Sequence, residues 1–139
     1  MKAEQIDTKV VNAILMYYKN AGTLLKWHWI TPQHINNMLK YIRKWKYLAG
    51  DIPKVSEYFD FELYALSWSI NECNLNPNAK RTSNANGKAD FGVMQMNECN
   101  LDLLTKIPKE LKNDIMNPET NVAVWMVWFK RQVKEKRQY

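Results

Sequence analysis

The sequence has few of the residues that build disulfide frameworks, metal centres and flexible linkers. Its 139 residues include two cysteines, two histidines and four glycines. Two cysteines are too few for a disulfide framework, so Cys73 and Cys99 form one bridge or, as we favour, two free thiols. His28 and His34 lie far apart, without other ligands at metal-binding spacing. We therefore expect no metal site and no cofactor.

Long apolar runs and linkers are missing as well. No apolar run approaches the length that spans a membrane, so stable membrane insertion is not expected. No Gly-Ser or Pro-rich linker, low-complexity tract or internal repeat divides the chain, which predicts a single domain over residues 1–139. Residues 1–7 turn polar at once and lack an apolar h-region, so we expect no signal peptide. Neither a Ser-His-Asp arrangement nor a phosphate-binding glycine loop is visible.

Aromatic residues and positive charge are abundant. Hydrophobic residues make up 46% of the chain, with six tryptophans, which is typical of a globular protein with a real core. The formal charge of +6 and the pI near 9.3 favour an anionic partner, such as the acidic polymers of a bacterial cell wall or nucleic acid. Much of the excess lies in residues 40–46 and 130–137, where a solvated helix face is the simpler explanation. No base-reading motif supports nucleic acid, and we do not expect it as a partner.

Apolar residues recur at helical spacing along most of the chain, so the sequence predicts a mainly α protein. In the first helix one face holds Ile6, Val10, Ile14 and Tyr17, with Val11, Leu15 and Tyr18 beside them. Thr31 is the expected N-cap of the second helix, because a proline follows it at the first helical position. The predicted helices cover residues 2–20, 32–49, 53–59 as one short turn, 61–72, 101–105, 108–115 and 118 onward.

One carboxylate has an unusual position. Residues 61–70 are apolar on nearly every side of a helical wheel, with Asp60 as the expected N-cap, which predicts a buried helix. The Asn-rich run that follows, with Pro77, ends this helix, so Glu72 lies in or near its last turn. The helix dipole and the apolar surroundings both disfavour the anion there, so we expect a raised pKa for Glu72. A glutamic acid that keeps its proton near neutral pH can act as a general acid.

A small β-hairpin or loop region is expected around residues 80–97. Residues 83–90 are rich in turn formers, and residues 91–97 alternate between apolar and polar side chains. If residues 91–97 form a strand, this alternation directs Gln95 toward a cleft and Val93 into the core.

Three segments carry a resemblance to a known family. They are Glu72 followed by Asn76-Pro77, the run Asp90-Phe91-Gly92-Val93-Met94-Gln95-Met96-Asn97, and Asn117-Pro118 with Asn121-Val122. In this order and spacing they resemble the lysozyme-like soluble lytic transglycosylases, above all the small members attached to secretion systems and to phage. The resemblance covers residues 61–133. It implies a lysozyme-like fold of the transglycosylase and goose-type lysozyme kind, with residues 61–133 as the catalytic core; the helices of residues 1–60 lie outside the resemblance.

The resemblance implies cleavage of the β-1,4 bond between N-acetylmuramic acid and N-acetylglucosamine in peptidoglycan. Glu72 would protonate the glycosidic oxygen and then take a proton from the muramyl 6-hydroxyl, which closes a 1,6-anhydro ring without consuming water. Asp90 keeps a second reaction open. Animal-type lysozymes share the Asp-aromatic-Gly run and use this Asp as the second carboxylate, so the alternative is hydrolysis with Glu72 and Asp90. A plain Asx-turn role for Asp90 is equally compatible.

The resemblance also implies a set of substrate-binding residues in the hairpin. Gly92 suits a close approach of the backbone to a sugar or a tight turn, and Phe91 precedes it. In the family the equivalent of Met94 touches the substrate, and the equivalent of Gln95 braces the catalytic region. Asn97 either bonds a sugar or caps the next helix.

The last helix completes the resemblance and departs from it in two places. Asn117 is the expected cap, and Asn121 is expected to be structural. Trp128 stands where the family usually has a Tyr near the catalytic Glu, and an indole can stack on a pyranose face without offering a hydroxyl. Trp125 replaces a small residue. A further departure lies outside this helix, where Cys73 replaces the Ser that commonly stands beside the Glu.

The expected partner is the glycan strand of peptidoglycan, in the periplasm or the cell wall. Without a visible signal peptide, delivery by a phage virion or by holin-mediated release is expected. The helices of residues 1–60 either pack on the core, as we favour, or dock on a phage structural protein. A separate hypothesis is a non-catalytic, helical protein that binds glycan or nucleic acid.

Overall fold

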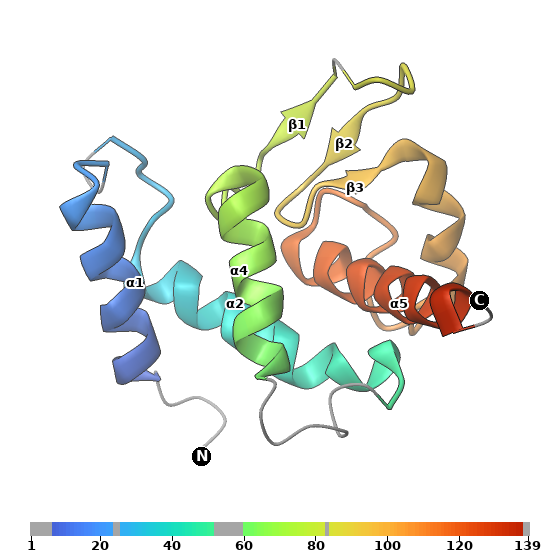
Figure 1. Cartoon of the computed structure of the whole chain (residues 1–139), viewed down its shortest axis with the longest axis horizontal. Coiled ribbons are helices and arrows are strands. Elements are labelled where there is room, and N and C mark those ends of the chain that lie inside the picture. Colours follow the sequence, from blue (N-terminus) through green and yellow to red (C-terminus); the bar gives the residue numbers. More distant parts are fainter. Residues whose placement is uncertain (1–6, 24–25, 52–59, 83, 138–139) are drawn as a thin grey trace.

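The computed structural model describes residues 7–23, 26–51, 60–82 and 84–137, with side chains as far as residue 135. The protein is mainly helical with a small antiparallel sheet, as expected from the sequence. Figure 1 shows α2 and α4 crossing at the centre, with α1 on one side, α5 on the other and the sheet beside the C-terminal end of α4. The elements are α1 (Thr8–Asn20), α2 (Pro32–Trp45), η2 (Lys46–Ala49), α4 (Phe61–Cys73), β1 (Lys80–Arg81), β2 (Asp90–Phe91), β3 (Met96–Asn97), η3 (Glu98–Lys106) and α5 (Pro118–Arg137).

Within these described ranges, no helix has the length and hydropathy needed to cross a membrane.

Helix α1 begins where Asp7 caps it, with the Asp7 carboxylate accepting from the Val10 amide at 3.3 Å. Its buried residues are Val11, Ile14 and Tyr18. Of the predicted face Ile14 is buried and Tyr17 is 56% exposed, and the other buried positions are Val11 and Tyr18, which were placed beside that face. The spacings 10-14-17 and 11-14-18 are equally helical, and packing against the neighbouring elements selects the second. Ile6 lies outside the described residues.

Helix α2 confirms its predicted start. Thr31 accepts a hydrogen bond from the His34 amide at 3.1 Å, and Pro32 follows at the first helical position. The helix then tightens into the 3₁₀ segment η2 and ends at Gly50, whose φ of 82° is readily adopted only by glycine. The short turn expected over residues 53–59 lies outside the described residues. The buried side chains of this stretch are Ile35, Asn36, Met38, Leu39, Ile42, Trp45 and Ala49.

Helix α4 begins as predicted, with the Asp60 carboxylate accepting from the Leu63 amide at 3.0 Å. It is not buried on all sides, which corrects the expectation. Phe61, Ala65, Leu66 and Ser69 are buried, whereas Leu63 is 44% exposed. A uniformly apolar wheel does not indicate which side faces solvent, so only tertiary packing decides it.

The segment after the sheet is helical only in part. The helix expected over residues 101–105 exists as part of the 3₁₀ helix η3. The helix expected over residues 108–115 was wrong, since this segment forms turns and bends. Two of its carbonyls accept from side chains of α5: Lys112 from the Thr120 hydroxyl at 2.7 Å and Ile115 from the Asn121 amide at 2.8 Å. These bonds to side chains of α5 take the place of helical ones.

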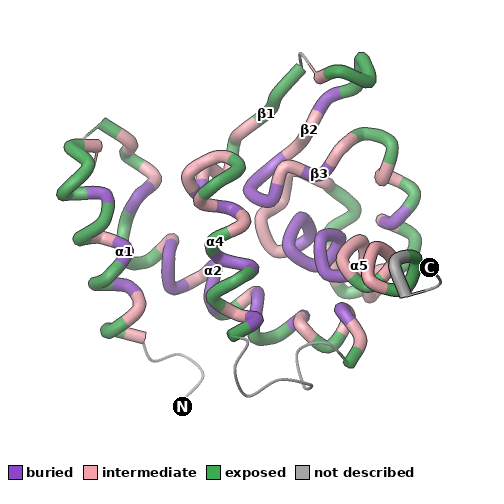
Figure 2. The backbone as a smooth tube through the Cα atoms, viewed as in Figure 1, coloured by how far each residue is buried: buried purple, intermediate pink, exposed green. Residues whose placement is uncertain are grey.

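The core runs through the middle of the molecule. Figure 2 shows that the buried residues are concentrated on the first half of α5, on α2 and on the hairpin beside α4. On α5 every residue from Thr120 to Met126 is buried. Asn117 caps this helix as predicted, with its side-chain oxygen accepting from the Thr120 amide at 3.1 Å. The buried hydrophobic residues from α1, α2, α4, the hairpin and α5 form one cluster.

Candidate functional site

The C-terminal end of α4 positions Glu72. The helix extends to Cys73, so Glu72 lies in the last turn as predicted. Asn74 and Leu75 then adopt left-handed conformations, with φ of 53° and 63°. The Asn74 amide donates to the Ile70 carbonyl at 3.0 Å, and the Leu75 amide donates to the Ser69 carbonyl at 3.4 Å. The helix therefore ends in a Schellman-type cap.

The N-terminal elements hold this unusual turn in place. The Trp29 indole N–H donates to the Asn74 carbonyl at 2.8 Å, and the His34 Nε2–H donates to the Leu75 carbonyl at 2.7 Å. The Tyr18 hydroxyl donates to the Asn74 side chain at 3.4 Å. Sequence reasoning missed these bracing residues, because the bonds join positions 41 or more residues apart. Left-handed non-glycine residues persist only where such surroundings fix them.

The hairpin lies directly against α4. Residues 92–95 form a tight turn between β2 and β3, which confirms the hairpin expected around residues 80–97; residues 91–97 are not one strand, so the alternation does not direct Gln95. The Ser69 hydroxyl donates to the Val93 carbonyl, and the Trp68 indole donates to the Met94 carbonyl at 3.0 Å. The Cys73 thiol also approaches the Val93 carbonyl, at 3.1 Å. One face of α4 therefore binds the turn through backbone carbonyls.

Asn121 of α5 fixes the hairpin from the other side. Its buried side chain accepts from the Met94 amide at 2.7 Å and donates to the Phe91 carbonyl at 2.9 Å and to the Ile115 carbonyl at 2.8 Å. The bonds to Met94 and Phe91 join α5 to residues 27 and 30 positions away, and the bond to Ile115 joins it to the segment just before the helix. The prediction that Asn121 is structural is confirmed.

A row of polar side chains crosses the three-stranded sheet. In the register of the sheet, Arg81 of β1 lies opposite Asp90 of β2, and Asp90 lies opposite Asn97 of β3. Directly opposed residues of antiparallel strands project from the same face, so these three side chains lie side by side. The Asn97 amide donates to the Asp90 carboxylate at 2.9 Å, and its own oxygen accepts from the Cys99 amide at 3.0 Å. Asn97 therefore caps η3 and holds Asp90 at once.

Glu72 interacts electrostatically with both charged residues of this row, Asp90 and Arg81. Partial burial raises the pKa of the Glu72 carboxyl above its ordinary value, the Asp90 carboxylate raises this pKa further, and the Arg81 guanidinium acts against both. The residue as a whole remains exposed. An acid with a raised pKa, an accessible side chain, a second carboxylate and a cation nearby can give up and take back a proton. Arg81 carries no motif, so no signal in the sequence pointed to it.

The other predicted site residues lie in different surroundings. Phe91 projects from the opposite face of the sheet to Asp90, with the Lys80 ammonium 5.4 Å from its ring centroid. Met94 is fully buried in the core. The Gln95 amide donates to the Ala79 carbonyl at 3.2 Å and to the Gly92 carbonyl at 2.8 Å, so it braces the turn.

Gly92 and Trp128 both pack against neighbouring elements. Gly92 has a φ of 77°, and a Cβ added there would meet the Asn121 Cγ at 2.8 Å and the Ile115 carbonyl oxygen at 3.2 Å. Its role in this structure is therefore close packing against α5. The Trp128 ring packs on Trp68, with centroids 5.3 Å apart.

The two cysteines are free thiols, which confirms the preferred expectation. Burial raises the pKa of Cys73 to about 11, so this thiol is protonated at neutral pH and acts as a weak donor. Among the residues that the structure describes, no group of three or more His, Cys, Asp or Glu side chains is placed to hold a metal ion.

Comparisons with protein-family models, with curated proteins and with solved structures find no match to this chain.

Proposed function

We propose that the protein is a peptidoglycan lytic transglycosylase with a lysozyme-like fold, in which Glu72 is the general acid and base. The observation that supports this best is the position of Glu72. It lies at the end of a helix with its pKa raised, beside the row Arg81, Asp90 and Asn97. Of the three segments that carry the resemblance, the hairpin segment is bound by Asn121 of the last one and approached by the Cys73 thiol, next to Glu72 of the first one.

The chemistry follows from one proton. Glu72 donates it to the glycosidic oxygen, and positive charge develops on the ring of the muramyl sugar. The resulting Glu72 carboxylate then accepts the proton of the muramyl 6-hydroxyl, whose oxygen bonds to the anomeric carbon. The Arg81 guanidinium stabilises the carboxylate between the two steps, because it favours the anionic form. A bound glycan removes water from Glu72 and raises its pKa further, which favours the protonated starting state.

Replacement of Glu72 by Gln tests the proposal. Because Glu72 is exposed, we expect Glu72→Gln to keep the stability of the wild type. Lysis of purified peptidoglycan should fall by about 10²-fold or more, since an amide cannot donate the proton. Glu110→Gln, at an exposed position of the segment between η3 and α5, is the matched control and should keep full activity. If wild-type protein cleaves neither Gram-negative nor Gram-positive walls, the non-catalytic binder replaces this proposal.

Hydrolysis is the second candidate, and the position of Asp90 favours it. Asp90 acts on Glu72 electrostatically and is held by Asn97, as a second catalytic carboxylate would need to be. Mass spectrometry of the products separates the two reactions, because a transglycosylase leaves 1,6-anhydro ends and a lysozyme leaves reducing ends.

Asp90→Asn gives an independent test of the same choice. If the protein is a transglycosylase, the variant stays active. The alkaline limit of its activity moves to lower pH, because removal of the Asp90 charge lowers the pKa of Glu72. In a hydrolase that uses Asp90 as nucleophile the variant is inactive at every pH.

A further inference from the structure

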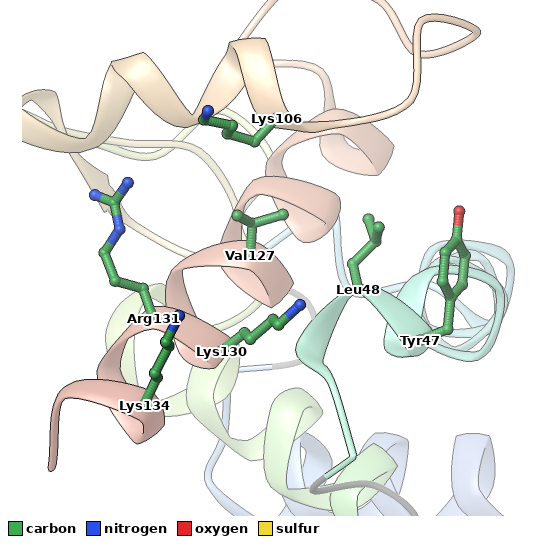
Figure 3. A pocket seen from close by; sticks show the side chains of 7 residues that line it. All are labelled: Tyr47, Leu48, Lys106, Val127, Lys130, Arg131 and Lys134. Carbon is green, nitrogen blue, oxygen red and sulfur yellow. The ribbon is translucent and has the colours of Figure 1, made fainter. Parts of the chain in front are cut away.

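Positive charge that the proposed site does not use gathers around one pocket. The pocket has a volume of about 720 Å³ and lies between η2, the end of η3 and the C-terminal half of α5. Figure 3 shows Val127 between Lys106 and Lys130, with Arg131 on one side and Leu48 and Tyr47 on the other. The lining residues are Tyr47, Leu48, Lys106, Val127, Lys130, Arg131 and Lys134.

The charges of this pocket differ from those of the other basic segment. In residues 40–46 the cations are largely offset: Arg43 binds Asp7 at 2.8 Å and Glu62 at 2.9 Å, and Lys46 binds Glu62 at 2.8 Å. That segment is therefore explained by ion pairs on the surface.

Three of the four pocket cations have no such partner. Arg131 lies 3.6 Å from Asp102, whose side chain is 60% exposed. Lys106, Lys130 and Lys134 form no ion pair with the residues that the structure describes. The lining contains no carboxylate. An excess of positive charge therefore surrounds the pocket.

The aliphatic stem of Lys130 lies beside the backbone turn that ends η2. A Cβ added at Gly50 would lie 3.4 to 3.6 Å from the Cγ, Cδ and Cε atoms of Lys130. The residue as a whole is exposed, so its ammonium is accessible to a ligand in the pocket.

The dipole of α5 does not account for the cluster. Cations near a helix C-terminus are stabilised within the last turn, which explains Lys134 before the end at Arg137. Lys130 lies farther from that end, and Lys106 belongs to another element. The charges from two separate elements meet because α5 packs against η3 and η2.

We propose that this pocket binds phosphate groups. A phosphate monoester carries a charge of about −1.5 to −2 and three acceptor oxygens, so one group can bind several of these cations, whereas a carboxylate has one charge and two oxygens. The volume also exceeds that of a single inorganic phosphate, and Leu48 with Val127 supplies an apolar surface for the carbon chain of a phosphate ester. The site goes beyond the proposed function and uses none of its residues.

Titration with inorganic pyrophosphate tests this proposal. The full chain is titrated at constant ionic strength, and amide and lysine side-chain chemical shifts are followed by NMR. We expect saturable shifts confined to the pocket, and affinity about tenfold weaker in Lys130→Gln/Lys134→Gln. The matched control is Lys88→Gln/Lys112→Gln, which removes two exposed lysines outside the pocket and also lowers the net charge from +6 to +4. It should change the affinity less than twofold.

Equal weakening in the two double variants would show adsorption by net charge and overturn the proposal, as would shifts spread over all lysines or no saturation. Charge and oxygen count favour a phosphate monoester over a phosphodiester polymer of the wall, in which each phosphate carries one charge. We therefore expect glycerol 3-phosphate to displace pyrophosphate and poly(glycerol phosphate) not to, and the reverse would overturn the proposal. Glu72→Gln should bind pyrophosphate as the wild type does, so this result is independent of catalysis.

Discussion

Asn121 offers the sharpest test of how the hairpin is held. Its side chain makes three hydrogen bonds between 2.7 and 2.9 Å and is fully buried. Asn121→Ala leaves the Met94 amide and the carbonyls of Phe91 and Ile115 without these partners. A buried group left unsatisfied costs about 1 to 3 kcal/mol, so we expect the free energy of unfolding to fall by about 3 to 5 kcal/mol. That is a large fraction of the stability of a small domain, which is about 5 to 15 kcal/mol.

Urea unfolding followed by tryptophan fluorescence measures this loss, and hydrogen exchange of the Met94 amide locates it. The Met94 amide should exchange faster in Asn121→Ala. In Asn121→Asp it should stay protected, because a carboxylate still accepts from it while both donors are lost. Thr120→Val is the matched control on the same buried face. It removes one bond, to Lys112, and should cost about 1 to 2 kcal/mol without faster exchange at Met94. A loss below about 1 kcal/mol in Asn121→Ala would refute the reasoning.

Three further outcomes are expected. Gly92→Ala should destabilise the protein by about 2 kcal/mol or more through its positive φ and its contact with Asn121, and a double-mutant cycle with Asn121→Ala should show coupling between the two sites. Burial lowers the pKa of His34, although its bond to the Leu75 carbonyl acts in the opposite direction, so the unfolded chain binds the proton more readily than the folded protein. The free energy of unfolding should therefore fall as the pH drops below about 6.5. Urea unfolding at pH 7 and at pH 5 should show a smaller fall in His34→Gln than in the wild type. Thr31→Ala should cost about 1 kcal/mol in thermal unfolding through loss of the N-cap, and Thr31→Ser should restore most of it.

Local signals in the sequence predicted the helix starts well. Asp60, Thr31 and Asn117 all cap the helices that they were expected to cap. Each cap depends on a contact between residues three positions apart, so the information lies within a few residues. The position of Glu72 in the last turn of α4 could be predicted for the same reason, since a stop signal follows it directly.

Segments whose conformation depends on contacts with another element were predicted poorly. The segment of residues 108–115 has helical spacing, yet its Lys112 and Ile115 carbonyls bind side chains of α5. The run of residues 91–97 alternates like a strand, yet it folds into a hairpin whose turn is fixed by Asn121. In both places hydrogen bonds to side chains of α5 outweigh a weak local preference.

The sequence by itself determined the helical class, most helix boundaries, the basic charge and the unusual carboxylate at position 72. Only the tertiary structure decided which charges surround that carboxylate, because strand register places Arg81 and Asp90 in one row. It also decided that residues 106 and 130–134 meet around one pocket, while the basic run of residues 40–46 is offset by ion pairs. The physical reason is the same in each case: these arrangements depend on packing and hydrogen bonds between elements that are distant in the chain.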